Sequence, residues 1–392
     1  MKCEWKNFQV GDLCSSISET YKGKDEYVVL INTSDVFDGK ILIHSLTRNA
    51  NLKGQFKKKF QAKDILYSEI RPANKRFAFV DIEDTHNYIA STKLMVIRAN
   101  TRIILPEYLF IFLQMPTVIA ELQMLAETRS GTFPQITFSS EVSPLNIALP
   151  NMGVQKRIVE IFRSLNDKIE LNNKINDNLY AQAKAIFEQQ FIDLETIPDG
   201  WKKGNLLDIA NYLNGLAMQK YRPNEDEVGL SVLKIKELRQ GSCDNSSELC
   251  SPNIKPEYII HDGDVIFSWS GSLLVDIWCG GTCGLNQHLF KVTSNTYDKW
   301  FYYLWTAHHL ERFIAIAADK ATTMGHIKRG ELAKAEVLIP SDEDYKAINS
   351  LMNPIFNLIV AKRIEARKLA ELRDELLPKL MSGEIDVSEV PV

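Results

Sequence analysis

An internal repeat is the feature of this sequence that most constrains its fold. Trp5-Lys6 is matched by Trp201-Lys202, 196 residues later, and the apolar and acidic positions that follow each pair keep the same spacing. The run Asp64–Ser68 is matched by Asp264–Ser268, 200 residues later. Such offsets drift by a few residues, as loop insertions and deletions would make them. The shared order of the matches is hard to obtain by chance, so the sequence predicts two copies of one structural plan.

The length of the repeat limits the kind of architecture. A chain of 392 residues is too long for one ordinary core, because domains typically contain about 100–200 residues. The period is also far longer than the ~20–50 residues of solenoid repeats. We therefore expect a duplicated domain with approximate internal two-fold symmetry. Each copy would consist of a globular part of about 150 residues followed by a helix.

Short apolar runs separated by turn residues predict strands in the globular parts, and aromatic and leucine spacing predicts short helices. The mixture defines an α+β fold class. The expected strands are 27–31, 41–44, 65–68, 78–82, 94–97 and 147–149 in the first copy and 265–268 and 337–339 in the second, with short helices at 107–113 and 298–307.

Two prolines, Pro150 and Pro340, mark sharp changes from strand to helix periodicity. After each one, apolar residues recur at steps of mostly three or four, from Val154 to Ile186 and from Ile348 to Leu380, as in the seam of a coiled coil. Neither helix is apolar enough all round to be a core helix, so each needs a partner. The other helix is the most economical partner, and two-fold symmetry of the copies makes the pair antiparallel.

Local signals refine these two helices. Ser341 to Asp344 has the spacing of a capping box at a helix start, and Gly383 suits a helix end. Pro354 is expected to bend the second helix or to delay its start. The first helix contains a cluster of asparagines, which either face solvent, the interpretation we favour, or fix the register of the seam. They are Asn166, Asn172, Asn173, Asn176 and Asn178.

Catalytic and cofactor motifs are absent from the sequence. It contains no phosphate-binding loop, no dinucleotide-binding glycine pattern, no nucleophile elbow and no zinc-protease helix motif. Cys279, Cys283 and His288 could make a zinc site, but reduced thiols in the cytoplasm are the better interpretation of six cysteines without a C-x-x-C pair. The lack of an apolar run of ~18–20 residues and of a signal peptide also favours the cytoplasm. We expect no cofactor and no metal.

Charge is concentrated in one segment of the first copy. The whole chain has a net charge of −4, but residues 40–80 contain ten Lys or Arg and two acidic residues, a net charge of +8. Such a segment suits DNA phosphates, and arginine can also bind guanine edges; the alternative is a solubilising surface. The candidate DNA-binding residues here are Arg48, Lys57, Lys58, Lys59, Arg71, Lys75 and Arg76.

The second copy is less basic, with a net charge of +1 over residues 218–240. Its candidate surface combines a Ser-Trp-Ser-Gly turn at 268–271 with Asn286-Gln287-His288, since amides can pair with adenine edges. Hydroxyl-rich loops near the end of each globular part are equivalent to each other and suit phosphates, although all these segments also suit plain turns. The candidates are Lys220, Arg222, Lys234, Ser268, Trp269, Ser270, His326 and Lys328, together with Arg129, Ser130 and Thr132 in the first loop and Lys320, Thr322 and Thr323 in the second.

The sequence resembles the specificity subunits of type I restriction-modification systems over its entire length. The segment 372–385, LRDELLPKLMSGEI, is similar to the characteristic helix end of that family. Ile197–Trp201 resembles the entry to its second target-recognition domain, and Leu149–Ile158 resembles the start of its central helix. Asp264–Gly271 is also similar to a family segment.

This resemblance implies a non-catalytic subunit in which each target-recognition domain binds one half of a split, asymmetric DNA target. The helices would set the gap between halves and dock two methyltransferase subunits, which restriction-translocase subunits would join. The implied division is 1–150 and 193–341 for the recognition domains, with helical regions at 151–192 and 342–392. The recognition subunit of a fused restriction-methylation enzyme, and a coiled-coil scaffold that binds protein, remain alternatives.

Overall fold

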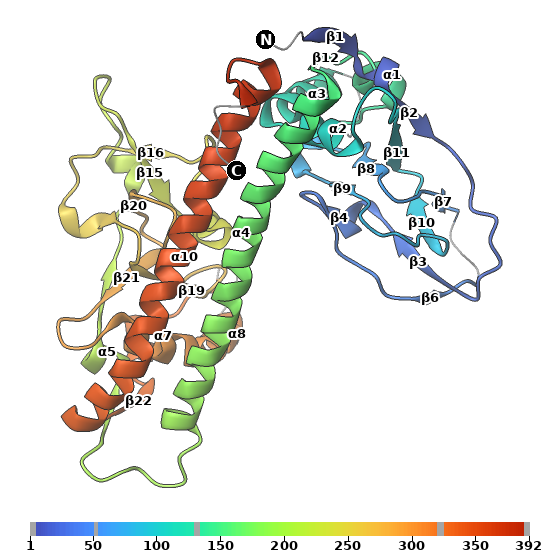
Figure 1. Cartoon of the computed structure of the whole chain (residues 1–392). Helices are drawn as coiled ribbons and strands as arrows, with labels where there is room; N and C mark the ends of the chain where they lie inside the picture. The colour runs from blue at the N-terminus through green and yellow to red at the C-terminus, as the bar shows by residue number, and fades with distance from the viewer. Residues whose placement is uncertain (1–4, 51–53, 129–133, 320–324, 388–392) are drawn as a thin grey trace. The chain divides into compact units, whose positions relative to one another are not determined.

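A computed structural model of the chain describes residues 5–50, 54–128, 134–319 and 325–387. The chain forms two compact units. Unit 1 consists of Met1–Asp167 and Ala370–Val392, and unit 2 consists of Lys168–Leu369. Each unit mixes strands and helices, as the α+β prediction requires, and each contains a stretch of both long helices (Figure 1).

The described part of unit 1 contains two four-stranded sheets, in the orders β2-β11-β8-β9 and β6-β3-β10-β7. Smaller pairs, β1-β12 and β4-β5, accompany them. The strands are β1 (Lys6–Gln9), β2 (Cys14–Ile17), β3 (Tyr27–Ile31), β4 (Val36–Phe37), β5 (Lys40–Ile41), β6 (Thr47–Arg48), β7 (Phe56–Lys58), β8 (Ile65–Ser68), β9 (Phe77–Phe79), β10 (Tyr88–Ser91), β11 (Leu94–Ala99) and β12 (Asn146–Leu149).

Unit 2 repeats this topology, except that the β4-β5 pair has no counterpart in its described part. Its described sheets have the orders β14-β21-β18-β19 and β16-β15-β20-β17, and β13 pairs with β22 as β1 pairs with β12. In both units the second sheet contains one parallel pair, β3 with β10 and β15 with β20. The strands are β13 (Lys202–Asn205), β14 (Asn211–Asn214), β15 (Leu230–Leu233), β16 (Leu249–Cys250), β17 (Ile259–Ile260), β18 (Val265–Ser268), β19 (Leu274–Ile277), β20 (Cys283–Leu285), β21 (Leu289–Thr293) and β22 (Glu336–Ile339). The predicted duplication is confirmed.

The repeated Asp-x-x-x-Ser run forms a central strand that is buried on both faces. In β8, Ile65 and Tyr67 belong to one hydrophobic cluster and Leu66 to another. In β18, Val265 and Phe267 likewise lie in one cluster and Ile266 in another. Because successive side chains point to opposite faces of a sheet, a strand between two apolar layers needs a continuous apolar run. This explains the sequence similarity of the two strands.

Helices cover one face of the first sheet in each unit. In unit 1 they are α1 (Val10–Leu13), α2 (Pro106–Leu113) and α3 (Pro116–Thr128). In unit 2 they are α5 (Leu206–Ile209), α7 (Lys299–His308), α8 (Leu310–Asp319) and α9 (Arg329–Leu332). A further helix, α6 (Ile235–Gln240), packs on the second sheet of unit 2. Trp300, Phe301 and Trp305 of α7 are at most 3% exposed. Their rings pack on Phe191 with centroids 5.7–6.3 Å apart, so aromatic burial anchors this layer.

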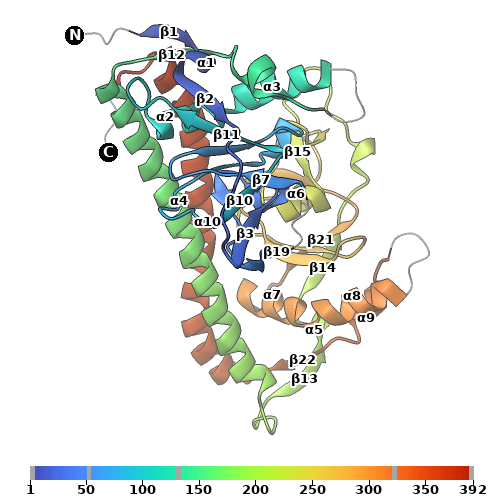
Figure 2. The ribbon, with the colours of Figure 1, turned by 90° about the vertical axis from the view of Figure 1, so that its right-hand side faces the viewer.

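The two long helices are α4 (Met152–Phe187) and α10 (Asp342–Ser382). In unit 1 the beginning of α4 packs on the end of α10, through Ile158 and Leu380. In unit 2 the end of α4 packs on the beginning of α10, through Phe187 and Met352. Stretches of the two helices are therefore antiparallel in each unit, as predicted (Figures 1 and 2).

The ends of α10 follow their predicted signals. The Asp344 backbone amide donates to Ser341 Oγ at 3.2 Å. At the other end, Gly383 has φ +75°, its amide donates to Leu380, and the Glu384 amide donates to Lys379 O at 2.9 Å. These are the two hydrogen bonds of a Schellman motif, which a left-handed glycine favours.

The expected delay of the second helix at Pro354 is wrong. The helix begins at Asp342 and continues through the proline. Proline removes one backbone hydrogen bond, but Met352 and Phe356 on either side are completely buried in the core of unit 2. Burying such side chains is worth about 1.5–3 kcal/mol each, which offsets the lost bond.

The strand expected at 41–44 is also wrong. β5 ends at Ile41, and residues 42–46 form a loop without regular structure in which every residue is exposed. The Leu42 amide donates a hydrogen bond to Asp35 O at 2.8 Å. In the described part of the chain, no strand pairs with residues 42–46. Apolar residues alone do not make a strand without a ladder partner.

Among the described residues, no single helix is long and apolar enough to cross a membrane. The bent pair α2 and α3, with an angle of 62° between them, meets the length and composition requirement only as a pair.

Candidate nucleic-acid interface

In each unit the central strand ends in a buried serine that shapes the following turn. Ser68 is 2% exposed and its hydroxyl donates to Ile70 O at 3.3 Å. Ser268 is fully buried, and its hydroxyl donates to Ser270 O at 3.3 Å and to Ser272 O at 2.9 Å. The prediction that Ser268 contacts DNA is therefore corrected, because its side chain has no exposed surface and holds the turn together.

A second segment joins this turn in both units. Ile70 forms an antiparallel bridge with Gln135, and Ser270 forms the equivalent bridge with His326. Gln135 and His326 closely follow the two predicted hydroxyl-rich loops. The predicted loop residues themselves lie outside the described part of the chain: Arg129, Ser130, Thr132, Lys320, Thr322 and Thr323.

In unit 1 this meeting point is a small ionic network. Lys93 Nζ lies 3.5 Å from Glu69 Oε2 and 3.4 Å from Gln135 Oε1. Lys58 Nζ lies 3.8 Å from Glu69 and donates to Leu94 O at 2.7 Å. Burial lowers the pKa of Lys58, and the charge of Lys93 lowers it further, while Glu69 raises it. An anion arriving here would meet two lysines that share a single carboxylate.

Arg71 lies next to this network. Its backbone is left-handed, with φ +44°, and its amide donates to Pro134 O at 3.2 Å. A left-handed conformation is uncommon for a residue with a side chain, and here it directs the chain from β8 into the Pro72–Asn74 turn. Arg71 as a whole residue is exposed.

In unit 2 the equivalent position is aromatic. The Trp269 ring has centroid distances of 6.1 Å to both His288 and His326. The indole N–H donates to Asn214 Oδ1 at 2.9 Å, and Ser270 Oγ is 3.0 Å from His288 Nδ1. The structure thus brings the predicted Ser-Trp-Ser turn, His288 and His326 into one cluster. Rings and amides in this arrangement suit stacking on bases and hydrogen bonding to their edges.

The basic segment of unit 1 does not form one patch. Arg76 donates from Nη1 to Ser34 O at 3.0 Å and lies 5.4 Å from the Phe37 ring centroid. Lys75 lies 3.8 Å from Asp38, and Lys59 lies 3.7 Å from Glu19. These three cations therefore support the local fold or are partly neutralised. By contrast, the exposed side chains of Arg48 and Lys57 have no ion-pair partner in the described ranges.

Two of the predicted cations of unit 2 share one acidic partner. Glu248 lies 2.7 Å from Lys234 Nζ and 3.3 Å from Arg222 Nη1, and the Lys234 contact is the main cause of its lowered pKa. Lys220 and Lys328 are exposed, and Lys328 precedes α9 as its N-cap. The weak positive charge of unit 2 is thus reduced further by local pairing.

The described residues contain no group of three or more His, Cys, Asp or Glu side chains that could hold a metal ion. Cys279 and Cys283, the residues of the suggested zinc site, are 8% and 0% exposed. Burial raises the pKa of Cys279 to about 11, which disfavours the thiolate that metal binding needs.

Two residues of these sites were not predicted from the sequence, Lys93 in unit 1 and Asn214 in unit 2. Lys93 lies in the turn between β10 and β11, as His288 lies between β20 and β21. Alignment of the two copies through this turn would have shown Lys93, because His288 was already a candidate. Asn214 is the last residue of β14, and only the pairing of β14 with β21 brings it next to Trp269. The sequence therefore carries no direct signal that Asn214 belongs to the site.

Comparison with known proteins agrees with a two-unit DNA-recognition fold. Residues 2–181 and 198–373 match the family described as the type I restriction modification DNA specificity domain. The specificity subunit of the type I restriction enzyme HindI from Haemophilus influenzae is 28% identical over 97% of this chain and 100% of its own length. That of MjaIX from Methanocaldococcus jannaschii is 25% identical over 73% of this chain and 71% of its own.

Among solved structures, the type I restriction-modification S subunit from M. genitalium matches with a TM-score of 0.53 and 14% identity, over 97% of this chain and 96% of that one. This structural similarity shows a shared fold. The duplicated units and their long helices define a DNA sequence-specificity protein with two recognition domains. The chain belongs to the type I restriction modification DNA specificity family. Its role is sequence specificity, as a non-catalytic component of a restriction-modification enzyme.

Proposed function

We propose that the two units bind two different DNA segments and that the chain thereby directs its partner subunits to a split, asymmetric target. One observation carries this proposal: the same fold presents different chemistry at equivalent positions. Lys58, Glu69 and Lys93 form an ionic network in unit 1, where unit 2 has Trp269 and His326. Side chains that differ this much favour different base pairs, so two unlike half-sites are expected.

The proposed domains follow one another along the sequence. Residues 1–150 and 193–341 would be the target-recognition domains, and 151–192 and 342–392 the helical regions. The continuous α4 helix supports this division, because its 36 residues extend about 54 Å at ~1.5 Å per residue. A stiff helix between two weak binding domains raises the effective concentration of the second at its half-site.

Contacts to phosphates and to bases are assigned separately. Exposed Arg48 and Lys57 in unit 1 and Lys220 and Lys328 in unit 2 would hold the DNA backbone. The turns that form bridges with Gln135 and His326 would approach base edges, with Arg71 in unit 1. In unit 2 the side chains are Trp269 and His326. The predicted Ser270 would support them, because it is only 6% exposed and its hydroxyl lies 3.0 Å from His288 Nδ1.

Partners follow from membership of the family, whose specificity subunits bind DNA and assemble with other subunits. The finer proposal is two methyltransferase subunits docked on the helices, joined by restriction-translocase subunits. The cytoplasm is the proposed compartment, which is supported by the free cysteines of the described part of the chain, those at positions 14, 243, 250, 279 and 283.

The test is co-expression with a methyltransferase subunit of the same system, followed by single-molecule sequencing of modified bases in a host that lacks other methylation. We expect one asymmetric motif with two parts and a fixed gap. A palindromic motif, or none, would contradict the proposal. Binding to duplex DNA should also weaken steeply with salt; an absence of DNA binding would instead favour a protein-binding scaffold.

A further inference from the structure

Unit 1 exposes an apolar loop at an edge of its second sheet. We name residues 42–46, which join β5 to β6, the apolar loop. Leu42, Ile43 and Leu46 are 54%, 39% and 61% exposed, and Tyr27, beside the end of the loop, is 48% exposed. Contiguous exposed apolar side chains mark binding surfaces in soluble proteins, because leaving them in water is unfavourable.

The backbone of the apolar loop is held in place. The Leu42 amide donates to Asp35 O at 2.8 Å, and His44 Nδ1 lies 3.2 Å from Tyr88 Oη. Beyond the loop, Thr47 and Arg48 pair with β3, with Arg48 opposite Tyr27. Its apolar side chains are therefore presented by a loop that is anchored at both ends.

The charge of the segment that carries the loop favours an anionic partner. Residues 39–63 contain seven Lys or Arg and no Asp or Glu. Lys58 and Lys59 pair with Glu69 and Glu19, whereas Arg48 and Lys57 are exposed without an ion-pair partner in the described ranges. Arg48, at the end of the loop, is exposed. A partner that offers apolar groups within a negatively charged framework fits this surface. Duplex DNA does so in the major groove, where the thymine C5-methyl group lies between rows of phosphates.

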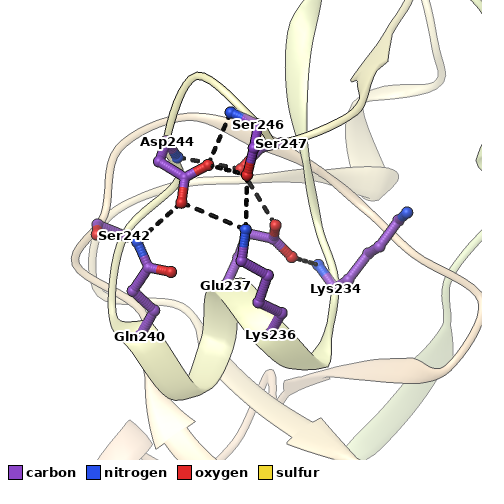
Figure 3. Close-up of polar contacts among 8 residues, drawn as sticks. All are labelled: Lys234, Lys236, Glu237, Gln240, Ser242, Asp244, Ser246 and Ser247. Carbon is purple, nitrogen blue, oxygen red and sulfur yellow. Dashed lines mark hydrogen bonds and ion pairs between the residues drawn. The ribbon is translucent and has the colours of Figure 1, made fainter. Parts of the chain in front are cut away.

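Unit 2 lacks this surface at the equivalent place. The segment before β16, residues 242–248, is polar, and its side chains bond to one another (Figure 3). Lys236 Nζ lies 3.3 Å from Asp244 Oδ2 and 2.7 Å from Ser246 Oγ. Ser247 Oγ donates to Glu237 Oε1 at 3.1 Å. These contacts satisfy the polar side chains of residues 242–248, so the apolar loop itself has no counterpart at this place in unit 2. The apolar side chains that unit 2 exposes beside that segment include Val228 and Leu249.

We propose that the apolar loop is a specificity-determining element that contacts thymine methyl groups in the half-site bound by unit 1, while Arg48 holds an adjacent phosphate. This inference rests on the proposed function, since it assumes that unit 1 binds one half of a split target. It adds the base chemistry that this half-site must contain. A half-site made only of G·C pairs would overturn it.

The experiment uses the full chain and its methyltransferase partner on a duplex that carries the motif found by sequencing. The variant is Ile43→Ser with Leu46→Ser. The matched control is Leu249→Ser, an exposed leucine in the equivalent strand β16 of unit 2. Both change exposed side chains, so folding is expected to be nearly unaffected. Circular dichroism verifies this.

We expect the double variant to bind the motif roughly tenfold more weakly, because two half-exposed aliphatic side chains are no longer buried on binding. Binding to unrelated duplexes and the dependence on salt should stay unchanged, since no cation is lost. The control should bind like the original chain.

Replacement of thymine by deoxyuracil in one half-site removes the methyl group without changing the protein. The original chain should lose affinity at that half-site, and the double variant should be insensitive to the replacement. Equal sensitivity of the two proteins would overturn the inference. So would unchanged DNA binding with loss of the methyltransferase partner, which would make the loop a protein contact. If the original chain shows no sequence preference, the proposed function itself fails.

Discussion

Replacement of Asn172 by leucine should stabilise unit 2. Asn172 and Asn176 lie four residues apart on α4 and are 0% and 7% exposed. Neither the amide nitrogen nor the oxygen of either residue has a hydrogen-bond partner in the described part of the chain. Lys362 is the main cause of the lowered pKa of Glu365, and Asn172 contributes least to it. The Asn172 amide nevertheless makes no hydrogen bond within the described part of the chain.

The magnitude follows from the unsatisfied groups. A buried polar group without a partner costs about 1–3 kcal/mol, and leucine replaces two such groups with methyl groups of similar size. Its extra bulk could cost about 1 kcal/mol in a packed seam. We therefore expect the free energy of unfolding to rise by about 1–2 kcal/mol.

Tryptophan fluorescence during urea unfolding is a suitable assay, because five of the six tryptophans, all except Trp5, belong to unit 2. Asn173→Leu is the matched control, since Asn173 is exposed on the next position of the same helix; it should change stability by less than ~0.5 kcal/mol. A loss of more than ~1 kcal/mol for Asn172→Leu would refute the reasoning and show that the amide has a partner in solution.

A double variant, Asn172→Leu with Asn176→Leu, tests why such residues would occupy the seam. A buried asparagine can fix the register of paired helices at a cost in stability. If Asn172 and Asn176 do so here, the double leucine variant should give modified motifs with more than one gap length. A single unchanged gap would assign the register to other contacts.

Four further predictions concern stability, binding and spacing. Asp64→Ala should cost about 3 kcal/mol of unfolding free energy, because Asp64 is 1% exposed and accepts two hydrogen bonds of 2.7 Å from Arg98; a loss below ~1 kcal/mol by circular dichroism would contradict this. Trp269→Ala should weaken binding to the motif about tenfold in filter-binding measurements, given ~1–3 kcal/mol per stacked base. Burial lowers the pKa of His309, so folding favours the neutral ring; stability is complete above the unfolded pKa of ~6.5 and falls as the pH decreases below it. In thermal melts between pH 7 and 5, the melting temperature of His309→Gln should fall less with decreasing pH than that of the original chain. One helical turn inserted after Leu171, with a matching turn in α10, should lengthen the gap by one or two base pairs in methylation maps, at ~5.4 Å per turn against ~3.4 Å per base pair.

Much of the fold could be predicted because its signals are local. The strands at 27–31, 65–68 and 265–268 have the predicted bounds. Gly383 ends α10 because only a residue that tolerates a left-handed backbone suits a Schellman motif. The duplication was visible because two equivalent central strands, each between two apolar layers, need the same run of residues.

The asparagine cluster shows where local signals are insufficient. We favoured a solvated face, and this is wrong for Asn172 and Asn176, which are buried. Asn173 and Asn178 are exposed, and Asn166 accepts a hydrogen bond from Arg373 at 2.9 Å. Which side of a helix faces its partner depends on the seam that the partner offers, and composition alone does not define it.

The candidate sites depended on tertiary structure for the same reason. The basic segment 40–80 is one run in sequence, but in the structure Arg76 bonds to backbone carbonyls, Lys58 joins Glu69, and the apolar loop is left exposed. Charge counts give no information on which cations are already paired.

By itself, the sequence determined that the chain has two α+β copies joined by long helices, because periodicity and turn residues act over a few neighbouring positions. Only the tertiary structure decided which side chains meet at the turns after β8 and β18. Those meetings require bridges between segments more than fifty residues apart, Ile70 with Gln135 and Ser270 with His326. Long-range pairing is selected by the packing of the whole unit, and no local pattern encodes it.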